Sequence, residues 1–383
     1  MDKDLLKKWS AFNPVIINFG RGVRVDLKRE LIGRQGIVVT SPRGKKQLKN
    51  DPVLGKIFVN NKQWLWIDDI QSNPEIVTLE KSILKFNNFT PEVVLAFGGG
   101  SVIDSAKVIA ISMASKIYDI KKLLLDPDAT NKRTIPLYAI PTTSGTGSET
   151  TPFATVWDHK DHRKYSLAGP AVYPYSAFVD SELTDGLPDL ITVSTGLDAI
   201  NQAAESIWNK NMTTLTEATA GRALKLGLTA LHSLIKDPKD NNSRDDMAEA
   251  SLLAGMAISQ TRTSLCHSIS YPLTTHFGIP HGLACAFTMP AVLRLNLSAD
   301  DGRFIRLACL LNDNPKSTQY DLIKKFDALN KELCVSSHIK NFVGNIDQLL
   351  DLSIEMQTPG RSDNNLVSVD DSDIRNILKS SWG

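Results

Sequence analysis

Four side chains in the second half of the chain offer donor atoms that suit a divalent metal ion. Asp198 and Gln202 are four positions apart in a predicted helix, so both lie on one face of it. His267 and His281 follow later, among small residues. Carboxylate and imidazole ligands suit Zn²⁺ or Fe²⁺, whereas the Gln202 amide is a neutral, weaker donor. A single His is more often structural than a ligand, so the pattern by itself leaves both readings open.

Two short loops have the composition of a phosphate-binding site. Residues 98–107, GGGSVIDSAK, follow an apolar run and open a predicted helix; residues 141–150, PTTSGTGSET, follow another such run. Glycine lets the backbone approach a phosphate, and the start of a helix offers free N–H groups. Either loop alone is compatible with an ordinary turn, and the first lacks the GxGxxG spacing. Because ligands of open α/β sheets bind beyond the strand carboxyl ends, the two loops together predict a nucleotide site.

The elements that must position these residues change in character near residue 188. Before it, helical patterns such as 76–85 alternate with apolar runs at 15–19, 36–40, 63–67, 93–97 and 135–140. This alternation predicts a Rossmann-like α/β domain over residues 1–188, with a parallel sheet covered on both faces. After it, long helical patterns predict an all-helical domain over residues 189–383, at 196–208, 215–234, 244–265, 282–295, 303–311 and 322–333. We expect exposed loops at 237–244 and 360–365.

The composition is that of an ordinary folded protein. Of 383 residues, 42% are hydrophobic and 22% charged, and 43 Lys and Arg against 42 Asp and Glu give a net charge of +1. Bulk charge therefore gives no support for a nucleic-acid or membrane-surface partner. We find no apolar run long enough to span a bilayer, no apolar signal region after the acidic residues 1–4, and no CxxC pair. We expect a cytoplasmic protein with free thiols.

Together, these motifs resemble the iron-containing (group III) alcohol dehydrogenases. The resemblance lies in residues 98–107, PTTSGTGSE, the GLDAINQAAES helix and HSISYPLTTHFGIPHG, and also in INFGRG at 17–22, SNP at 72–74 and PGRSDNN at 359–365. It spans essentially the whole chain. It implies a dehydroquinate-synthase-like architecture, in which residues 189–383 bind metal and substrate, and the metal and the nicotinamide share the cleft between the domains. It also implies a homodimer and metal-assisted hydride transfer.

By position, the resemblance implies metal ligation by Asp198, Gln202, His267 and His281. Asp198, His267, His281 and Tyr271 are the candidate catalytic residues. The candidate cofactor-binding residues of the two loops and their neighbours are Asn73, Gly99, Gly100, Ser101, Asp104, Thr142, Thr143, Thr146, Ser148 and Lys164. The family usually has His at the positions of Gln202 and Tyr271. Gln202 leaves the identity of the metal open between Fe²⁺ and Zn²⁺. Tyr271 replaces an imidazole near the nicotinamide, and a tyrosine is a poor base at neutral pH.

The residues after the second predicted strand favour NADPH over NADH. NAD-preferring relatives often carry an acid there, which binds the ribose 2′-hydroxyl. Here residues 41–46 read SPRGKK, with no acid and three bases, and Ser41 with Arg43 suits a 2′-phosphate. The alternative is a solvated basic loop, in which case NADH is possible.

A narrower resemblance concerns the substrate. Residues 151–174, 194–209 and 249–290 are similar to the branch that reduces phosphonoacetaldehyde to 2-hydroxyethylphosphonate in phosphonate metabolism. A phosphonate dianion needs positive charge, and Arg262 is the candidate, with an ion-pair arginine as the alternative. Phe153 and His276 are candidate lining residues. The other hypotheses are a reductase of sulfoacetaldehyde, lactaldehyde or an alkanal, a lyase of the dehydroquinate-synthase type, and a non-catalytic nucleotide-binding protein.

Overall fold

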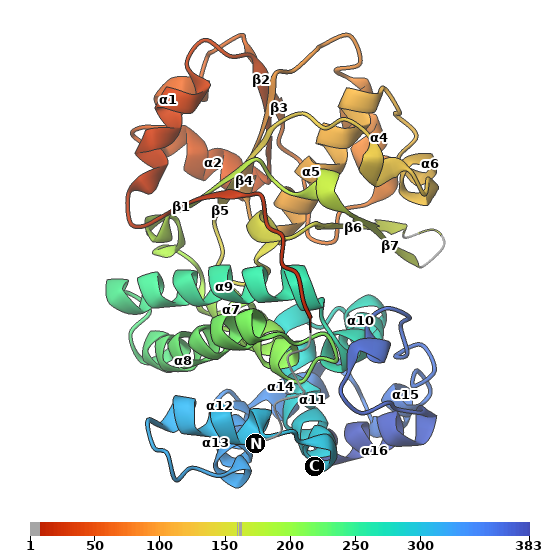
Figure 1. The fold of residues 1–383 in the computed structure, drawn as a ribbon. Helices are drawn as coiled ribbons and strands as arrows, with labels where there is room; N and C mark the ends of the chain where they lie inside the picture. The colour runs from red at the N-terminus through yellow and green to blue at the C-terminus, as the bar shows by residue number, and fades with distance from the viewer. Residues whose placement is uncertain (1–7, 159, 161–162) are drawn as a thin grey trace. The chain divides into compact units, whose positions relative to one another are not determined.

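The computed structural model describes residues 8–158, 160 and 163–383. The acidic residues 1–4, and positions 159, 161 and 162 of the 151–174 stretch, lie outside the described residues. The chain divides into an N-terminal unit, residues 13–187 with 238–248, and a C-terminal unit, residues 8–12, 188–237 and 249–383 (Figure 1). A single boundary at residue 188 therefore misassigns two short segments. Residues 8–12 belong to the C-terminal unit, and residues 238–248 belong to the N-terminal unit.

A parallel sheet forms the centre of the N-terminal unit. Its six strands run in the order β1 (Ile16–Phe19), β8 (Ser176–Val179), β5 (Leu137–Pro141), β4 (Val93–Gly98), β2 (Gly36–Thr40) and β3 (Trp64–Ile67). Every pair in it is parallel, which confirms the predicted fold class. The sequence did not reveal β8 or the antiparallel hairpin of β6 (Phe153–Asp158) and β7 (Arg163–Ala168). These strands mix polar with apolar residues, so no continuous apolar run marks them.

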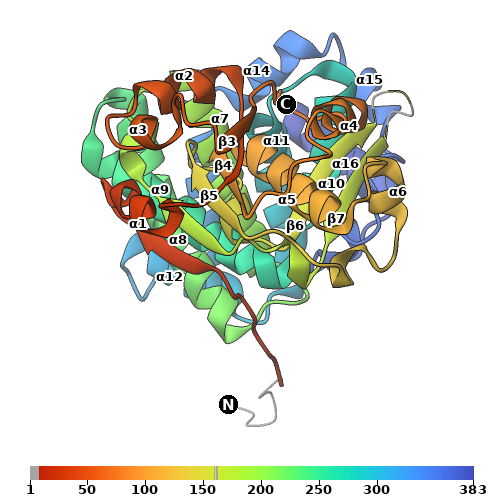
Figure 2. The ribbon, with the colours of Figure 1, turned by 90° about the horizontal axis from the view of Figure 1, so that it is seen from above.

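Each face of the sheet has its own hydrophobic core, because successive side chains of a strand point to opposite faces. Ile37 and Val39 pack with α4 (Ile76–Leu84), α5 (Gly100–Ser115) and α6 (Ile120–Leu125). Val38 and Leu95 pack with α1 (Leu27–Leu31), α2 (Pro42–Asn50) and α3 (Gly55–Phe58). Figure 2 shows the two helical layers on either side of the strands. Strands buried on both faces explain the apolar runs of the sequence.

The C-terminal unit is helical, as predicted. Its helices are α7 (Asp189–Ile207), α8 (Thr214–Lys236), α9 (Asn241–Thr261, whose first turns belong to the N-terminal unit), α10 (Leu265–Phe277), α11 (His281–Asn296), α12 (Arg303–Asn312), α13 (Gln319–Glu332), α14 (Val335–Phe342), α15 (Ile346–Leu350) and α16 (Asp371–Trp382). The prediction of a helix over 244–265 is wrong at its C-terminal end. Helix α9 ends at Thr261, because Arg262 adopts a left-handed conformation with φ of 62° before α10 begins. The loop expected at 237–244 is shorter, because α9 already begins at Asn241.

Helix α11 is the core helix of the C-terminal unit. With the turn that follows it, His281–Ala299 is the one helix among the described residues that is long and apolar enough to cross a membrane. Yet 67% of its most apolar window is buried inside the protein. It packs against α7, α10, α13, α14 and α16, so its apolar character serves the core.

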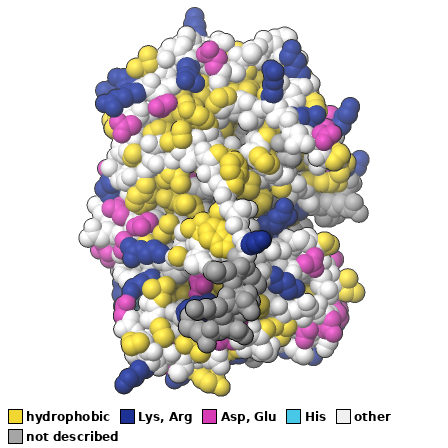
Figure 3. Space-filling view, viewed as in Figure 1, with side chains coloured by type: hydrophobic (Ala, Val, Ile, Leu, Met, Phe, Trp, Pro, Cys, Tyr) yellow, Lys and Arg dark blue, Asp and Glu magenta, His cyan; other side chains and the backbone are white. Residues whose placement is uncertain are grey.

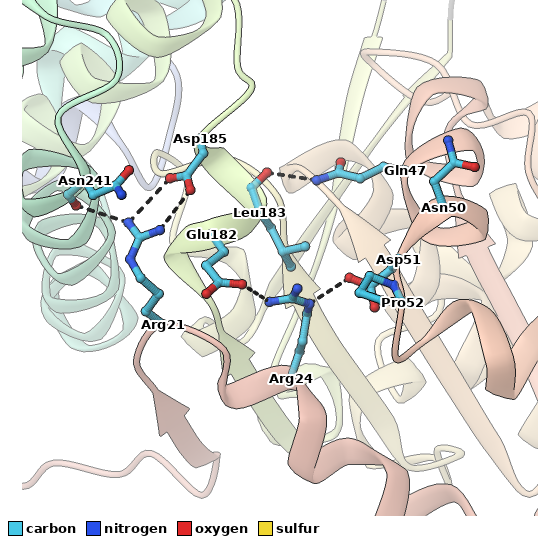
Figure 4. Close-up of a pocket in the computed structure, with 10 residues that line it drawn as sticks. All are labelled: Arg21, Arg24, Gln47, Asn50, Asp51, Pro52, Glu182, Leu183, Asp185 and Asn241. Carbon is cyan, nitrogen blue, oxygen red and sulfur yellow. Dashed lines mark hydrogen bonds and ion pairs between the residues drawn. The ribbon is translucent and has the colours of Figure 1, made fainter.

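Ion pairs attach residues 238–248 to the N-terminal unit. Arg21 donates to Asp185 at 2.8 Å and to Asp245 at 2.6 Å. Arg24 donates to Asp51 at 2.7 Å and to the fully buried Asp180 at 2.6 Å. Figure 4 shows both arginines lining one pocket between α2 and the segment after β8. Carboxylates surround each guanidinium, so these residues stabilise the fold and offer no uncompensated charge to a ligand.

Candidate active site

The two glycine-containing loops leave neighbouring strands of the sheet at the same edge. The first joins β4 to α5, and the second follows β5, which pairs in parallel with β4. A Cβ added at Gly99 would lie 3.1 Å from Thr143 Oγ1, and one at Gly100 would lie 2.5 Å from Thr146 Cγ2. Glycine at both positions eases this close approach, and at Gly100 a larger residue would force Thr146 to move. Gly99 is the N-cap of α5 and no side chain caps the helix, so its first turn presents backbone N–H groups suited to a nucleotide phosphate.

Asp104 and Ser148 hold these loops together from within the protein. Ser148 Oγ donates to Asp104 Oδ1 at 2.5 Å, and the Thr155 N–H donates to Asp104 Oδ2 at 2.9 Å. The buried Lys107 ammonium donates to Ser148 Oγ at 3.1 Å and to the Phe153 carbonyl at 2.6 Å. These bonds tie α5 to the second loop and to β6. Asp104 and Ser148 therefore fix the two glycine-containing loops in place, and Lys107, which was not among the predicted site residues, interacts with both.

Replacing Glu149 by glutamine is expected to weaken the pH dependence of stability. Glu149 is buried near Lys107, and burial raises its pKa from 4.5 to about 7 against the opposing effects of its own backbone N–H and the Lys107 charge. Between these values the folded state binds more protons than the unfolded state, so stability falls as pH rises. The wild-type thermal midpoint should therefore drop more than that of Glu149→Gln between pH 5 and pH 7.5, measured by calorimetry.

The exposed Glu92→Gln variant is the matched control and should follow the wild type. Lys107, with its pKa lowered to about 8 by burial, acts in the opposite direction and at higher pH, since there the unfolded state binds more protons. Parallel curves for wild type and Glu149→Gln would contradict the prediction.

The remaining cofactor candidates lie on several elements of the N-terminal unit. Ser41 caps α2, and Arg43 Nη2 donates to a backbone carbonyl at 3.0 Å. Because β2 and β4 are parallel neighbours, these two residues and the first glycine loop leave the same edge of the sheet. Asn73 is exposed in the left-handed region with φ of 55°, and the Lys164 ammonium lies 5.6 Å from the ring centroid of Trp157.

Three predicted metal ligands converge in the C-terminal unit, together with a cysteine. Asp198 lies on α7, His267 on α10, and His281 opens α11, with Cys285 one turn later. One ligand atom of each lies within 4.8 Å of the others. His267 Nε2 is 3.2 Å and His281 Nε2 3.9 Å from Asp198 Oδ1, while Cys285 Sγ is 3.8 Å from His281 Nε2. His281, with 36% of its side chain exposed, forms the open side of the cluster.

Glu205 fixes the orientation of His267. Its carboxylate lies 2.6 Å from His267 Nδ1 and also accepts the backbone N–H groups of Ser264, at 2.8 Å, and His267, at 3.1 Å. An Nδ1 proton shared with this carboxylate leaves the Nε2 lone pair for a metal. Glu205 was not among the predicted site residues, although an acid seven positions after Asp198, on the same face of an apolar helix, was a usable signal.

The donor set fits a divalent cation. Gln202 hydrogen-bonds Asp198, and its buried Oε1 has no partner among the described residues. Burial raises the pKa of Asp198, but His267 and His281 outweigh it, and the pKa lies below the ordinary value. Burial likewise raises the pKa of Cys285, and the same two imidazoles lower it to about 7. Carboxylate, two imidazoles and a thiol, with an unpartnered amide oxygen nearby, are the ligand types of a Zn²⁺ or Fe²⁺ site.

Arg361 reaches the neighbourhood of this cluster through Tyr271, and Arg262 lies close to Arg361. The Tyr271 ring lies nearly parallel to the His281 ring, with the ring centroids 6.1 Å apart. Arg361 Nε donates to the Tyr271 hydroxyl at 3.3 Å. A Cβ added at Gly360 would lie 3.8 Å from Arg262 Nη1, so Arg262 is close to the residue that precedes Arg361. Burial and the Arg361 charge lower the pKa of Arg262, so the Arg361 charge acts on the Arg262 guanidinium. Arg361 was missed as a candidate; its only sequence signal was its place in the PGRSDNN motif.

Of the two predicted lining residues, His276 points away from the cluster. His276 is exposed and pairs with Glu355 at 2.9 Å. It lies nine positions after His267 on α10, which places it on the opposite face of the helix. Phe153 begins β6 in the N-terminal unit, where its carbonyl binds Lys107.

Comparison with known proteins agrees with this architecture. Residues 14–181 match the family "Iron-containing alcohol dehydrogenase", and residues 192–382 match "Fe-containing alcohol dehydrogenase family, C-terminal". The NADPH-dependent butanol dehydrogenase of Clostridium saccharobutylicum is 31% identical over 86% of this chain and 85% of its own length. The sulfoacetaldehyde reductase of Bilophila wadsworthia is 30% identical over 76% of this chain and 74% of its own length.

Solved structures show the same fold. The sulfoacetaldehyde reductase of Bifidobacterium kashiwanohense, in complex with NAD⁺, aligns with a TM-score of 0.82 and 26% identity over 98% of this chain and 99% of that one. The iron-containing alcohol dehydrogenase of Thermococcus thioreducens gives a TM-score of 0.86 at 24% identity, over 97% of this chain and 99% of that one. The predicted resemblance is thereby confirmed: the chain belongs to the iron-containing alcohol dehydrogenase family and is an oxidoreductase.

Proposed function

We propose that this protein reduces phosphonoacetaldehyde to 2-hydroxyethylphosphonate with NADPH. The observation that carries the proposal is the arginine pair, Arg262 and Arg361, beside Tyr271 and the His281 cluster. Burial and the Arg361 charge lower the pKa of Arg262, and an anion with several oxygens would relieve the repulsion between the two like charges. A phosphonate has three such oxygens and suits this pair better than a neutral alkanal does.

The side chains of the cluster have separate tasks in this reaction. Asp198, His267 and His281 would hold a divalent ion, and Glu205 fixes the His267 ring so that its Nε2 would face that ion. When bound, the ion supplies Lewis-acid chemistry for the aldehyde oxygen, and the dihydronicotinamide supplies the hydride. Tyr271, stacked on His281 and bonded to Arg361, orients the aldehyde between the anion site and the ligands. The alkoxide proton comes from water or a nearby hydroxyl.

NADPH is the proposed cofactor because Ser41 and Arg43 follow β2 at the edge that carries the first glycine loop, with no acid between residues 41 and 46. The measurement is kcat/KM with NADPH and with NADH. We expect NADPH to be preferred and Arg43→Ala to reduce that preference. A clear preference for NADH in the wild type would contradict this part of the proposal.

Replacing Arg361 by methionine is expected to raise KM for phosphonoacetaldehyde by about 10–100-fold, equivalent to about 1.4–2.7 kcal/mol. The long apolar side chain keeps the packing volume but removes the donors. KM for butanal should change much less, because a neutral aldehyde loses only the Arg361 contact that holds Tyr271 and no charge interaction with the arginine pair. The measurement is NADPH oxidation over both substrates. Arg222→Met, at an exposed position of α8, is the matched control.

The wild-type screen also decides between the alternatives. Equal kcat/KM for charged and neutral aldehydes, unaffected by Arg361→Met, would overturn the substrate assignment. A lyase would consume substrate with no net oxidation of NADPH, and a non-catalytic protein would bind NADPH in calorimetry and consume nothing.

Sulfoacetaldehyde is the second candidate substrate. The same arginine pair suits a sulfonate, and two of the similar proteins are sulfoacetaldehyde reductases. The two anions differ in charge: a phosphate-like group loses its second proton near pH 6, whereas a sulfonate stays a monoanion. If the pair recognises a dianion, KM for phosphonoacetaldehyde should fall between pH 5.5 and 7.5 while KM for sulfoacetaldehyde stays flat. A higher kcat/KM for sulfoacetaldehyde throughout would favour the second candidate.

We further propose a cytoplasmic homodimer. Strand β1 is one of the two edge strands of the sheet, and its Ile16 and Phe19 are 51% and 40% exposed. Figure 3 shows hydrophobic side chains exposed among charged ones on the N-terminal unit. An edge strand with apolar side chains is a ready pairing surface for a second copy. Light scattering should give a dimer, and Ile16→Lys should shift it towards the monomer; a monomeric wild type would contradict this proposal.

A further inference from the structure

Cys285 lies where a metal ligand would be expected. It is fully buried on α11, one helical turn after His281, so both side chains point to the same face. Its Sγ lies 3.8 Å from His281 Nε2 and belongs to the group of donor atoms that includes Asp198 and His267. No other cysteine among the described residues belongs to that group.

The spacings within the group match a tetrahedral metal site. Bond lengths of about 2.0–2.1 Å to N or O and about 2.3 Å to S place neighbouring ligand atoms roughly 3.4 Å apart for N and O, and roughly 3.6 Å apart for N and S. The observed separations are 3.2 Å and 3.9 Å from Asp198 Oδ1 to the two imidazoles, and 3.8 Å from Cys285 Sγ to His281. These three separations lie within about 0.5 Å of the tetrahedral values, and the remaining pairs of ligand atoms lie within 4.8 Å of each other.

The chain also lacks a strong fourth ligand at the usual place. Gln202 offers an amide oxygen, which is neutral and a weaker donor than the imidazole that the family usually has there. A thiolate is a strong, charged and soft ligand, and soft sulfur ligands favour Zn²⁺ over Fe²⁺. The structure thus places a compensating donor within reach of the cluster.

We propose that Cys285 Sγ is the fourth ligand of the metal, with Asp198, His267 and His281, and that the site therefore prefers Zn²⁺ to Fe²⁺. This inference rests on the metal dependence of the proposed function but not on its substrate. Gln202 then lies beside the site, hydrogen-bonded to Asp198, and positions that carboxylate.

The test uses the complete protein loaded with one metal at a time. X-ray absorption of the Zn²⁺ form should show one sulfur neighbour at about 2.3 Å. The Co²⁺ form should show a thiolate-to-cobalt charge-transfer band in the near ultraviolet. In competition, Zn²⁺ should displace Fe²⁺. Neither spectrum requires a variant or turnover, so the result holds whichever aldehyde is the substrate.

Variants give an independent measurement. Cys285→Ala should lose the charge-transfer band and bind Zn²⁺ at least 10-fold more weakly, while Cys309→Ser, at a half-buried position of α12, should keep both properties. A bound metal with only nitrogen and oxygen neighbours would overturn the inference and leave the proposed function standing. A protein that binds no divalent ion would overturn the inference and the proposed metal chemistry together.

Discussion

Replacing His267 by alanine is expected to abolish tight metal binding and to lower kcat by about 10³-fold or more. The imidazole is one of the potential metal ligands of the cluster. The Glu205 carboxylate holds it in place, 2.6 Å from its Nδ1. Loss of a Lewis acid removes several kcal/mol of transition-state stabilisation, and each 1.36 kcal/mol is tenfold in rate. The measurements are metal content by elemental analysis and NADPH oxidation with the best aldehyde.

A companion variant separates lost chemistry from lost folding. His267→Ala also removes the imidazole partner of the buried Glu205 carboxylate, which keeps its two backbone N–H donors, so this variant should be less stable than the wild type. His281→Ala removes a partly exposed imidazole and should lose metal and turnover with a smaller effect on the unfolding midpoint. His338→Ala, exposed on α14, is the control for both. Full turnover by a metal-free His281→Ala protein would refute the metal mechanism.

Replacing Gly282 by alanine is expected to destabilise the protein by about 3 kcal/mol and to weaken metal binding at the same time. A Cβ at this position would lie 1.8 Å from the Ser194 carbonyl oxygen and 3.0 Å from the Asp198 nitrogen. Both are backbone atoms of α7, so no side chain can move aside, and α11 must shift away from α7. Since Gly282 follows His281, the shift also separates His281 from Asp198.

Thermal unfolding and Zn²⁺ affinity should therefore fall together in Gly282→Ala, although every ligand is still present. Gly186→Ala, where an added Cβ meets nothing within 4 Å, is the control and should be close to the wild type. An alanine variant with unchanged stability and metal affinity would show that the α7–α11 contact does not position the ligands.

Local pattern was sufficient for much of the fold. The strands β2, β4 and β5 are buried on both faces, so their apolar runs were visible without any knowledge of their neighbours. The mixed composition of β6, β7 and β8 gave no such signal. Similarly, Asp198 and Gln202 were recognisable as a pair because helical periodicity places them on one face.

Short-range spacing and contiguous motifs were enough to predict the architecture, the family and most of the candidate ligands, because that information is local in the chain. The side chains that join these ligands became apparent only in the folded protein. Cys285, Glu205 and Arg361 reach the site through the packing of α7, α10, α11 and the segment after α15, and Glu205 meets His267 across 62 positions of the chain. Contacts over such separations depend on how helices pack, and no local pattern records that packing.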